Sequence, residues 1–217
     1  MKTMLVIGMG RFGKHLATRM SDLGNEVMIV DKQEERVNEL LPIVTFAQIG
    51  DCTNESMLAS LGVGNFDMCF VCIGDDFQSS LEITSLLKDL GAKYVVSKAD
   101  RAIHEKFLLR NGADEVIHPE RDAALRAARK YSNKNIFDFF ELTNDFSVFE
   151  VLPPDSWIGK SIKQINVRSK YNINIVGIKQ NNKVVPITSV EYIFNREEHI
   201  IIVGNINENS RLFEKNK

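Results

Sequence analysis

The sequence predicts an α/β protein, in which a Rossmann-like, doubly wound parallel sheet is followed by a small α+β domain that binds a ligand. Three observations support this prediction. Short apolar segments alternate with longer amphipathic ones over the first 118 residues, a glycine-rich loop follows the first apolar segment, and the pattern changes after Pro119. With 217 residues, of which 44% are hydrophobic, the chain can form one or two domains with a sizeable core.

The first half of the chain contains six segments with the composition of buried strands. Alternation of strands and helices predicts parallel strands joined by right-handed crossovers. Apolar residues occupy both faces of these strands, which is typical of a sheet covered by helices on both sides. Gly24 and Gly91 each follow a leucine at an expected helix end. We expect strands at 3–7, 26–30, 43–49, 67–73, 93–98 and 115–118, and helices at 11–23, 33–40, 54–60, 77–90 and 101–111.

The second half begins with an exposed amphipathic helix at 120–131, followed by the apolar segment IFDFFEL at 136–142. We interpret this segment as a linking helix, whose phenylalanines need a partner in the second domain or in a dimer interface. We place the domain boundary between a first domain of residues 1–134, which includes the crossover helix, and a second of residues 135–217. Further strands are expected at 147–152, 173–179, 183–187 and 199–204, with a short helix at 160–165.

Composition excludes several classes of protein. A net charge of −2 and a pI near 6.1 disfavour a general nucleic-acid binder, which needs clustered lysine and arginine. No stretch approaches the roughly 18 consecutive apolar residues of a membrane-spanning helix, and the first residues lack the features of a signal peptide. We therefore expect a cytoplasmic protein.

The three cysteines are an odd number, which fits a reducing compartment better than a disulfide framework. Cys69 and Cys72 have the spacing of a redox motif, but they lie in the apolar segment MCFVCI. Residues three apart on a strand point to opposite faces, so we interpret both as small core residues. The four histidines are scattered along the chain, and a zinc site is not expected.

The glycine-rich loop is Gly8-x-Gly10-x-x-Gly13, which follows a strand directly and opens a helix. Asp31 stands at the end of the second strand, 18 residues after Gly13. This arrangement is the fingerprint of a dinucleotide-binding fold, in which phosphates lie at the helix N-terminus and the acidic residue accepts a ribose hydroxyl. Asp31 disfavours a 2′-phosphate, and the neighbouring Lys32 weakens that preference.

Ligands in such sheets bind beyond the carboxyl ends of the strands, where this chain has several polar residues. Arg11, Lys98 and nearby carboxylates suit a mononucleotide polyphosphate at least as well as a dinucleotide. Helix capping is an alternative role for Asp75, Asp76 and Glu120. The candidate nucleotide-binding residues are Gly8, Met9, Gly10, Arg11, Phe12, Gly13, Asp31, Lys32, Asp51, Cys52, Ile73, Gly74, Asp75, Lys98 and Glu120.

Two functional alternatives stay open at this point. A small NAD-dependent oxidoreductase would need a substrate pocket with an acid or base at the nicotinamide. The region after Phe146 has one histidine, no cysteine and few clustered carboxylates, so it is more typical of a binding module. A redox-sensing regulator that binds NADH and DNA is a weaker alternative.

The whole chain resembles the cytosolic regulatory subunits of Ktr/Trk-type potassium transport systems, which are built from the domain called regulator of conductance of K⁺. The resemblance covers nearly the whole chain. It rests on VIGMGRFG at 6–13, VDKQEERV at 30–37, Gly50-Asp51, SLGVGNFDMCFVCIGDD at 60–76, GADEVIHPERD at 112–122 and VLPPDSWIGKSIKQINVRSKYNINIVGIK at 151–179.

The resemblance implies a regulatory subunit that is not an enzyme. Dimers of such subunits assemble into an octameric ring on a membrane-embedded potassium-translocating subunit, and the ring gates that partner in response to ATP or ADP, or to NAD or NADH in some relatives. Arg11 would then reach the terminal phosphate of a nucleotide in the neighbouring subunit. Lys98 would lie near the nucleotide, and Glu120 would help to hold a divalent cation such as Mg²⁺ or Ca²⁺ at the dimer interface.

The resemblance also implies a second ligand. The C-terminal domain of many relatives binds cyclic di-AMP between two subunits, with an arginine and an asparagine beside apolar residues. The chain has QNNKVV where some relatives place a histidine in the following hairpin. Residues at similar positions here are Val167, Arg168, Asn174, Ile175 and Pro186.

Overall fold

The computed structural model describes residues 1–132, 136–143, 146–181 and 183–205. The chain divides into two compact units, Met1–Asp122 and Ala123–Lys217. The division falls inside helix α6 (Pro119–Ser132), whereas the sequence-based boundary lies just after this helix. In the described residues, we find no helix that combines the length and the apolar character needed to span a membrane.

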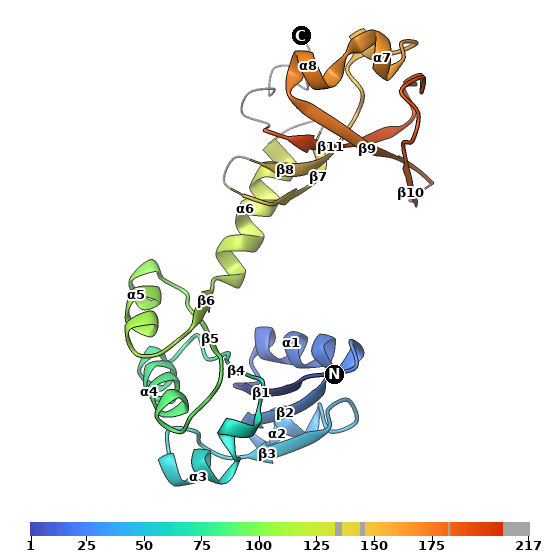
Figure 1. Ribbon diagram of the computed structural model, residues 1–217. Helices are drawn as coiled ribbons and strands as arrows, with labels where there is room; N and C mark the ends of the chain where they lie inside the picture. Colours follow the sequence, from blue (N-terminus) through green and yellow to red (C-terminus); the bar gives the residue numbers. More distant parts are fainter. Residues whose placement is uncertain (133–135, 144–145, 182, 206–217) are drawn as a thin grey trace. The chain divides into compact units, whose positions relative to one another are not determined.

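The first unit is built on a six-stranded parallel sheet with the strand order β3-β2-β1-β4-β5-β6 (Figure 1). This order confirms the predicted doubly wound sheet, because the chain returns to the centre after β3 and then extends the sheet in the opposite direction. The strands are β1 (Thr3–Ile7), β2 (Glu26–Asp31), β3 (Phe46–Ile49), β4 (Met68–Val71), β5 (Val95–Lys98) and β6 (Glu115–Ile117). The helices are α1 (Arg11–Asp22), α2 (Glu34–Asn38), α3 (Glu55–Ser60), α4 (Phe77–Asp89) and α5 (Ala102–Arg110), with a 3-10 turn η1 at Val63–Asn65.

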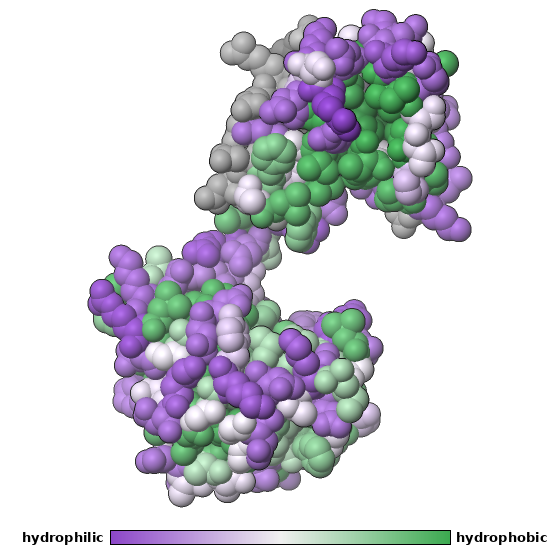
Figure 2. All heavy atoms as spheres, in the orientation of Figure 1, coloured by the Kyte–Doolittle hydropathy of each residue, from purple (hydrophilic) through white to green (hydrophobic). Residues whose placement is uncertain are grey.

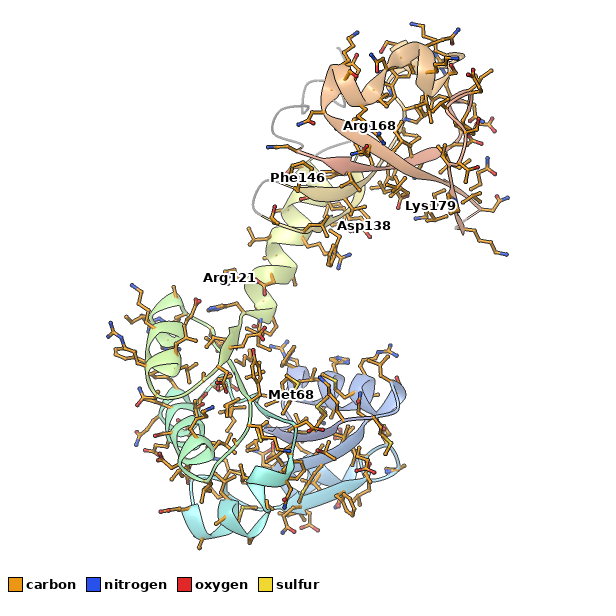
Figure 3. All side chains as sticks on the ribbon, in the orientation of Figure 1. Met68, Arg121, Asp138, Phe146, Arg168 and Lys179 are labelled. Atoms are coloured by element: carbon orange, nitrogen blue, oxygen red, sulfur yellow. The ribbon has the colours of Figure 1, made fainter. Side chains whose placement is uncertain are left out.

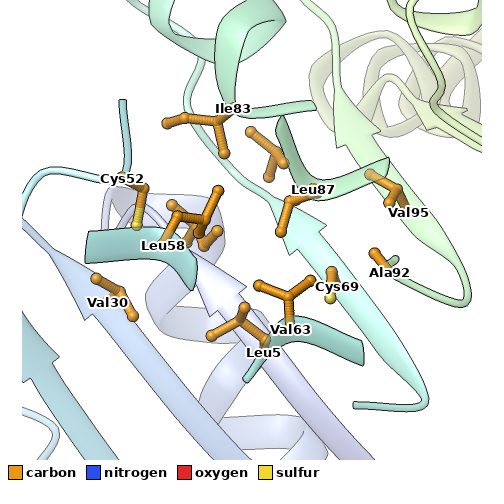
Figure 4. Packing of buried hydrophobic residues seen from close by; sticks show 12 residues of the cluster. Leu5, Val30, Cys52, Leu58, Val63, Cys69, Ile83, Leu87, Ala92 and Val95 are labelled. Carbon is orange, nitrogen blue, oxygen red and sulfur yellow. The ribbon is translucent and has the colours of Figure 1, made fainter. Parts of the chain in front are cut away.

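Both faces of this sheet are covered. Ala17 of α1 and Val37 of α2 belong to the core on one face, while Leu58 of α3 and Leu87 of α4 belong to the core on the other (Figure 4). Helix α5 packs through Leu108 against the α4 side. Strand β3 is shorter than predicted, because the chain turns at Pro42 and pairing with β2 starts only where the Thr45 amide donates to the Val27 carbonyl at 3.0 Å.

The second unit contains a five-stranded antiparallel sheet with the order β10-β9-β11-β8-β7. Helices α7 and α8 cover one face, and their core includes Trp157, Phe194 and Ile200. A Ser161–Gln164 capping box starts α7. The strands are β7 (Ile136–Glu141), β8 (Ser147–Val151), β9 (Ile173–Gln180), β10 (Lys183–Pro186) and β11 (His199–Gly204), and the helices are η2 (Asp155–Trp157), α7 (Ile162–Ile165) and α8 (Val167–Tyr171).

The segment IFDFFEL is a strand, so the interpretation of 136–142 as a linking helix was wrong. Residues Ile136–Glu141 form β7, which pairs with β8 in antiparallel register, with Phe140 opposite Val148. Phenylalanine and isoleucine favour a pleated sheet, and the neighbouring strand supplies the backbone hydrogen bonds. The ring of Phe137 stacks on His199 of β11 with centroids 4.0 Å apart, while Phe140 is exposed.

Candidate functional site

A cavity of about 240 Å³ lies at the carboxyl ends of β1, β2, β3 and β4. It therefore spans the point between β1 and β4 at which the strand order reverses, which is where doubly wound sheets bind ligands. The cavity is lined by nine of the predicted residues, namely Gly8, Gly10, Asp31, Lys32, Asp51, Cys52, Ile73, Gly74 and Asp75. Six predicted residues do not line it, namely Met9, Arg11, Phe12, Gly13, Lys98 and Glu120.

The three glycines of the loop have three different steric environments. Gly8 adopts a φ of +93°, and a Cβ there would lie 2.9 Å from Cγ1 of Ile73. A Cβ on Gly13 would lie 2.0 Å from the Gly8 carbonyl oxygen, so the loop and the first turn of α1 meet too closely for any side chain. Around Gly10, by contrast, no atom lies within 4 Å of an added Cβ. The open space at Gly10 is where a ligand can approach the backbone.

Asp31 is held in place by the glycine loop itself. Its Oδ2 accepts a hydrogen bond from the Met9 amide at 2.6 Å, and its Oδ1 accepts one from the Gln33 amide at 2.8 Å. The side chain is only 5% exposed, and the Arg36 guanidinium lies 3.7 Å from Oδ2. Because each carboxylate oxygen can accept a second bond, Asp31 keeps acceptor capacity for a ribose hydroxyl at the cavity wall.

Lys98 and Glu120 form a separate cluster of charges next to Gly74. The Lys98 ammonium lies 2.9 Å from Glu120 Oε1 and 3.1 Å from Asp100 Oδ1. An added Cβ on Gly74 would lie 2.8 Å from the same ammonium, which places Lys98 against the cavity wall. Burial opposes the charge of Lys98, but hydrogen bonds to the two carboxylates outweigh it and raise the pKa of Lys98.

Glu120 connects this cluster to Arg11. The hydrogen bond from Lys98 lowers the pKa of the Glu120 carboxyl against the effect of burial, and the charge of Arg11 lowers it further. Arg11 is exposed at the first position of α1 and does not line the cavity of its own chain, yet it lies near enough to this cluster for its charge to act on Glu120. Glu120 lies in the first turn of α6, where an acidic side chain also favours the helix dipole.

The other carboxylates at this edge have local structural roles. Asp76 caps α4, because it accepts hydrogen bonds from the amide and hydroxyl of Ser79, and these bonds lower the pKa of Asp76. Asp51 accepts bonds from the amide and hydroxyl of Thr53, and they lower the pKa of Asp51 in the same way. Both residues line the cavity; in Asp51 a single oxygen, Oδ1, accepts both bonds, whereas in Asp76 each carboxylate oxygen accepts one.

All three cysteines are buried in the core, as predicted for Cys69 and Cys72. Cys69 packs in the core on the α4 face of the sheet and Cys72 in the core on the α1 face. Burial raises the pKa of Cys52, Cys69 and Cys72 to about 12, so none of these thiols is a reactive thiolate at neutral pH. Cys52 and Cys72 contribute small apolar surface to the cavity wall.

The described residues of a single chain offer few ligands for a metal ion. Among residues 1–132, 136–143, 146–181 and 183–205, no three histidine, cysteine, aspartate or glutamate side chains gather in a ligand group. Glu120 offers one carboxylate, and its Oε1 is occupied by Lys98. A divalent cation at Glu120 would therefore need further oxygen ligands from a nucleotide or a second subunit.

A second cavity, of about 460 Å³, lies in the C-terminal unit. Its wall includes Val167 and Arg168 of α8 together with Asn174 and Ile175 of β9. The Arg168 Nε donates to Asn174 Oδ1 at 2.7 Å, which fixes the guanidinium at the cavity (Figure 3). Pro186 does not line this cavity; it lies opposite Gly177 in the β9–β10 pairing, one residue before the lining residue Ile187. Figure 2 shows that hydrophobic atoms form a continuous patch within a hydrophilic rim on this unit.

Sequence reasoning missed several residues of the first cavity. Gln33, Arg36, Gly50, Cys72 and Ser79 also line it. Arg36 could have been found, because it lies one position before Val37, which periodicity assigns to the buried face of α2. Gln33, Gly50 and Cys72 reach the cavity from the segments that follow β2, β3 and β4, and Ser79 reaches it from the first turn of α4.

The fold and the first cavity together define a Rossmann-type nucleotide-binding protein with an added small antiparallel domain. The family model named TrkA-N domain matches residues 4–119, and the model named TrkA-C domain matches residues 147–216. The chain therefore belongs to the family of proteins that combine a TrkA-N and a TrkA-C domain and, within it, to the Ktr-type regulatory subunits. This membership confirms the resemblance inferred from the motifs, and it places the chain among ligand-binding subunits and not among enzymes.

The curated relatives cover almost the whole chain. It is 39% identical over 214 residues to Ktr system potassium uptake protein C of Bacillus subtilis, which covers 99% of this chain and 96% of the relative. It is 36% identical over 203 residues to Ktr system potassium uptake protein A of the same organism, covering 94% of this chain and 91% of the relative. The protein A of Vibrio alginolyticus is 30% identical over 203 residues, covering 94% and 92% of the two chains.

Solved structures share the fold at low sequence identity. The GsuK RCK domain matches 100% of this chain and 48% of its own, with a TM-score of 0.69 and 14% identity. A GsuK channel bound to NAD matches 100% of this chain and 40% of its own, with a TM-score of 0.67 and 14% identity. This chain therefore spans less than half of each GsuK chain, and these matches speak for the fold alone.

Proposed function

We propose that this chain is a cytosolic subunit of a potassium uptake system, which binds an adenine nucleotide in its first unit and gates a membrane-embedded, potassium-translocating partner. The observation that carries the proposal is the cavity at the β1–β4 switch point, with Gly10 open beneath it and Asp31 fixed at its wall. The relatives named Ktr system potassium uptake proteins support the potassium system. A GsuK structure described as bound to NAD and another described as bound to ADP support nucleotide binding at this fold.

The nucleotide would lie with its ribose at Asp31 and its phosphates at the start of α1. Gly8 and Gly10 line the cavity, and the free amides of the first turn of α1 favour an anion. Met9, Phe12 and Gly13 would shape the loop from outside the cavity, since the Met9 amide holds Asp31 and Gly13 closes against Gly8. Ile73 and Cys52 would supply apolar contact.

Arg11 is the residue that would distinguish ATP from ADP. Its side chain is exposed and does not line the cavity of its own chain, which leaves it available for a terminal phosphate in a neighbouring subunit. A ligand shifts a two-state assembly only by the difference in its affinity for the two states. A charge-assisted bond to the γ-phosphate contributes about 1.5–3 kcal/mol, which corresponds to a tenfold to hundredfold preference per site.

Lys98 and Glu120 would transmit the nucleotide's charge. A polyphosphate near Gly74 would compete with Glu120 and Asp100 for the Lys98 ammonium. The Glu120 carboxylate would then be free to help hold a divalent cation such as Mg²⁺ or Ca²⁺ with phosphate oxygens. Because Glu120 lies in the first turn of α6, its change of partner acts on the helix that leads into the second unit.

Isothermal titration calorimetry on the full chain tests the nucleotide proposal. The wild type is expected to bind ATP and ADP, and Arg11→Ala should lose about tenfold to hundredfold affinity for ATP while its affinity for ADP changes little. Arg19→Ala is the matched control, because Arg19 is an exposed arginine on the same helix and pairs with Asp22 across one turn. Equal losses for ATP and ADP would make Arg11 a general phosphate contact.

The assembly is tested separately. Light scattering after size-exclusion chromatography should report dimers that form an octameric ring, since Arg11 can contact a nucleotide of another subunit only in an assembly. NADH is included as a ligand in the calorimetry, because NAD or NADH is the alternative nucleotide. A monomer that turns over NADH with a simple carbonyl substrate would refute the gating function and favour an oxidoreductase.

The second cavity supports a second ligand, which we propose to be cyclic di-AMP. Two neighbouring residues of α8, Val167 and Arg168, and two of β9, Asn174 and Ile175, all line this cavity, and Pro186 lies on the adjoining strand β10. The Arg168 guanidinium offers donors for a phosphate, and the apolar side chains offer contact for a base. Arg168→Ala should weaken cyclic di-AMP binding and leave ATP binding unchanged, with the exposed Arg196→Ala as the control. Unchanged cyclic di-AMP affinity in Arg168→Ala would contradict the assignment.

A further inference from the structure

Arg36 is the one arginine that lines the nucleotide cavity within the described residues. It stands on α2, directly before Val37, which is buried in the core between α2 and the sheet. Burial of Val37 fixes the rotation of this short helix, so the side chain of Arg36 is directed to the cavity at the end of β2. Its position is therefore set by the core and not by a surface contact.

The guanidinium of Arg36 forms an ion pair with Asp31 but no hydrogen bond to it. The distance of 3.7 Å from the guanidinium to Asp31 Oδ2 is an ion pair and longer than a hydrogen bond. The same Oδ2 already accepts the Met9 amide at 2.6 Å. In the described part of the chain, the Arg36 side chain makes no hydrogen bond, and it is 42% exposed. The side chain therefore lines the cavity with its hydrogen-bonding groups unused within the described residues and part of its surface open to a ligand.

The place of Arg36 along the cavity decides which part of a nucleotide it meets. The phosphates belong at Gly8 and Gly10, at the end of β1, and the ribose at Asp31, at the end of β2. Arg36 lies on the helix that follows β2, on the side of Asp31 away from the glycine loop in the strand order. The group beyond the ribose of a nucleotide is its base.

The charges around Arg36 favour a flat, uncharged partner over a second anion. Asp31 neutralises the guanidinium locally, and Asp51, which follows the next strand of the sheet, adds a further carboxylate to the cavity lining. A guanidinium whose edge faces a carboxylate keeps its plane free, and such planes stack on aromatic rings. The apolar wall formed by Ile73 and Cys52 suits the same flat group.

We propose that Arg36 is a specificity-determining residue of the nucleotide site, where its guanidinium stacks on the purine ring. This inference rests on the proposed nucleotide-binding function and adds the selection of a purine over a pyrimidine base. Lys32 and the glycine loop hold parts of the nucleotide that ATP and UTP share, whereas Arg36 contacts the part that differs.

Calorimetry with ATP and UTP on the nucleotide-free full chain tests this proposal. In Arg36→Ala, the affinity for ATP should fall by between about 2-fold and about 30-fold, the range of a guanidinium stacked on an aromatic ring, while the smaller affinity for UTP changes less. Arg36→Lys keeps a cation opposite Asp31 but removes the plane, so it should lose ATP affinity as well. Arg19→Ala, an exposed arginine outside the cavity, should change neither affinity.

Each other outcome overturns the inference in a recognisable way. Full ATP affinity in Arg36→Lys would show that charge and not stacking matters, and equal losses for ATP and UTP would assign Arg36 to the ribose or the phosphates. A loss confined to NADPH relative to NADH would assign it to a 2′-phosphate. Unchanged ATP binding in Arg36→Ala would leave nucleotide binding intact and remove Arg36 from the site, whereas a wild type that binds no adenine nucleotide would refute the proposed function itself.

Discussion

Two glycines three residues apart in the same loop are expected to respond in opposite ways to the same methyl group. In Gly13→Ala the new Cβ would lie 2.0 Å from the Gly8 carbonyl oxygen, so the two groups must separate by about 1 Å. Gly8 cannot give way cheaply, because its amide donates to the Val30 carbonyl at 2.9 Å and because the chain after β4 is so close that a Cβ added to Gly8 would lie 3.3 Å from the Cys72 carbonyl carbon. We expect Gly13→Ala to cost about 3 kcal/mol of unfolding free energy, at the upper end of the range for overpacking.

Gly10→Ala leaves the fold nearly unchanged. No atom lies within 4 Å of its Cβ, and its φ of −67° with ψ of −176° is an extended conformation that any residue adopts. Alanine restricts the unfolded chain more than glycine does, which raises the unfolding free energy, but it is a poorer helix N-cap, which lowers the unfolding free energy. Each effect is about 1 kcal/mol or less, and the two oppose each other. The methyl group would instead occupy the space through which phosphates approach the loop, so nucleotide affinity should fall steeply.

Urea unfolding followed by far-UV circular dichroism, together with ATP titration, measures both effects. With a urea m-value of about 2 kcal/mol/M, Gly13→Ala should lower the unfolding midpoint of the first unit by about 1.5 M, while Gly10→Ala should leave it nearly unchanged. A Gly13→Ala midpoint within about 0.3 M of the wild type would refute the close-packing argument. Wild-type ATP affinity in Gly10→Ala would refute the approach of phosphates at that position.

Three further predictions concern stability and reactivity. Ser80→Ala should be neutral or stabilising in urea unfolding, because Ser80 Oγ is buried without a hydrogen-bond partner in the described residues. Thr84→Val should lower the unfolding free energy by about 1–3 kcal/mol, because it leaves the buried Ser97 hydroxyl without its partner. A larger loss of stability in Ser80→Ala than in Thr84→Val would contradict this. Burial opposes the charge of Glu150, but the contacts with Lys179 and His199 outweigh burial and lower the pKa of Glu150. The stabilisation by the Glu150 carboxylate is therefore present above its unfolded pKa and is lost as the pH falls through its folded pKa. In Glu150→Gln, the unfolding midpoint should fall less between pH 7 and pH 3 than in the wild type. The three cysteines should react with a thiol reagent only on unfolding, and rapid labelling of the native chain would contradict their burial.

Local patterns were sufficient for much of the first unit. The alternation of strands and helices predicts the doubly wound parallel sheet that is observed, and the loop from Gly8 to Gly13 with Asp31 predicts the edge of the sheet at which the cavity lies. These features can be predicted because they depend on residues that are close together in the sequence. For the same reason the opposite faces of Cys69 and Cys72 could be predicted, since their spacing on a strand determines them.

Other features required the folded chain. The segment 136–142 is apolar enough for a helix or a strand, and only pairing with β8 decides for the strand, because hydrogen bonds between strands join residues that the local pattern cannot relate. The wall of the first cavity is decided in the same way, since Arg36 meets Asp31 only after Val37 is buried in the core.

Periodicity and spacing along the chain are sufficient to predict the glycine loop typical of nucleotide sites, the doubly wound sheet and the presence of a second domain. Which charged side chains meet follows only from the folded chain. Strand β5 ends and helix α6 begins at the same edge of the sheet, which brings together Lys98, Asp100 and Glu120. Arg168 meets Asn174 because α8 folds back on β9. Charges act through space over a few ångströms, and the distances between them are fixed by packing and not by position in the sequence.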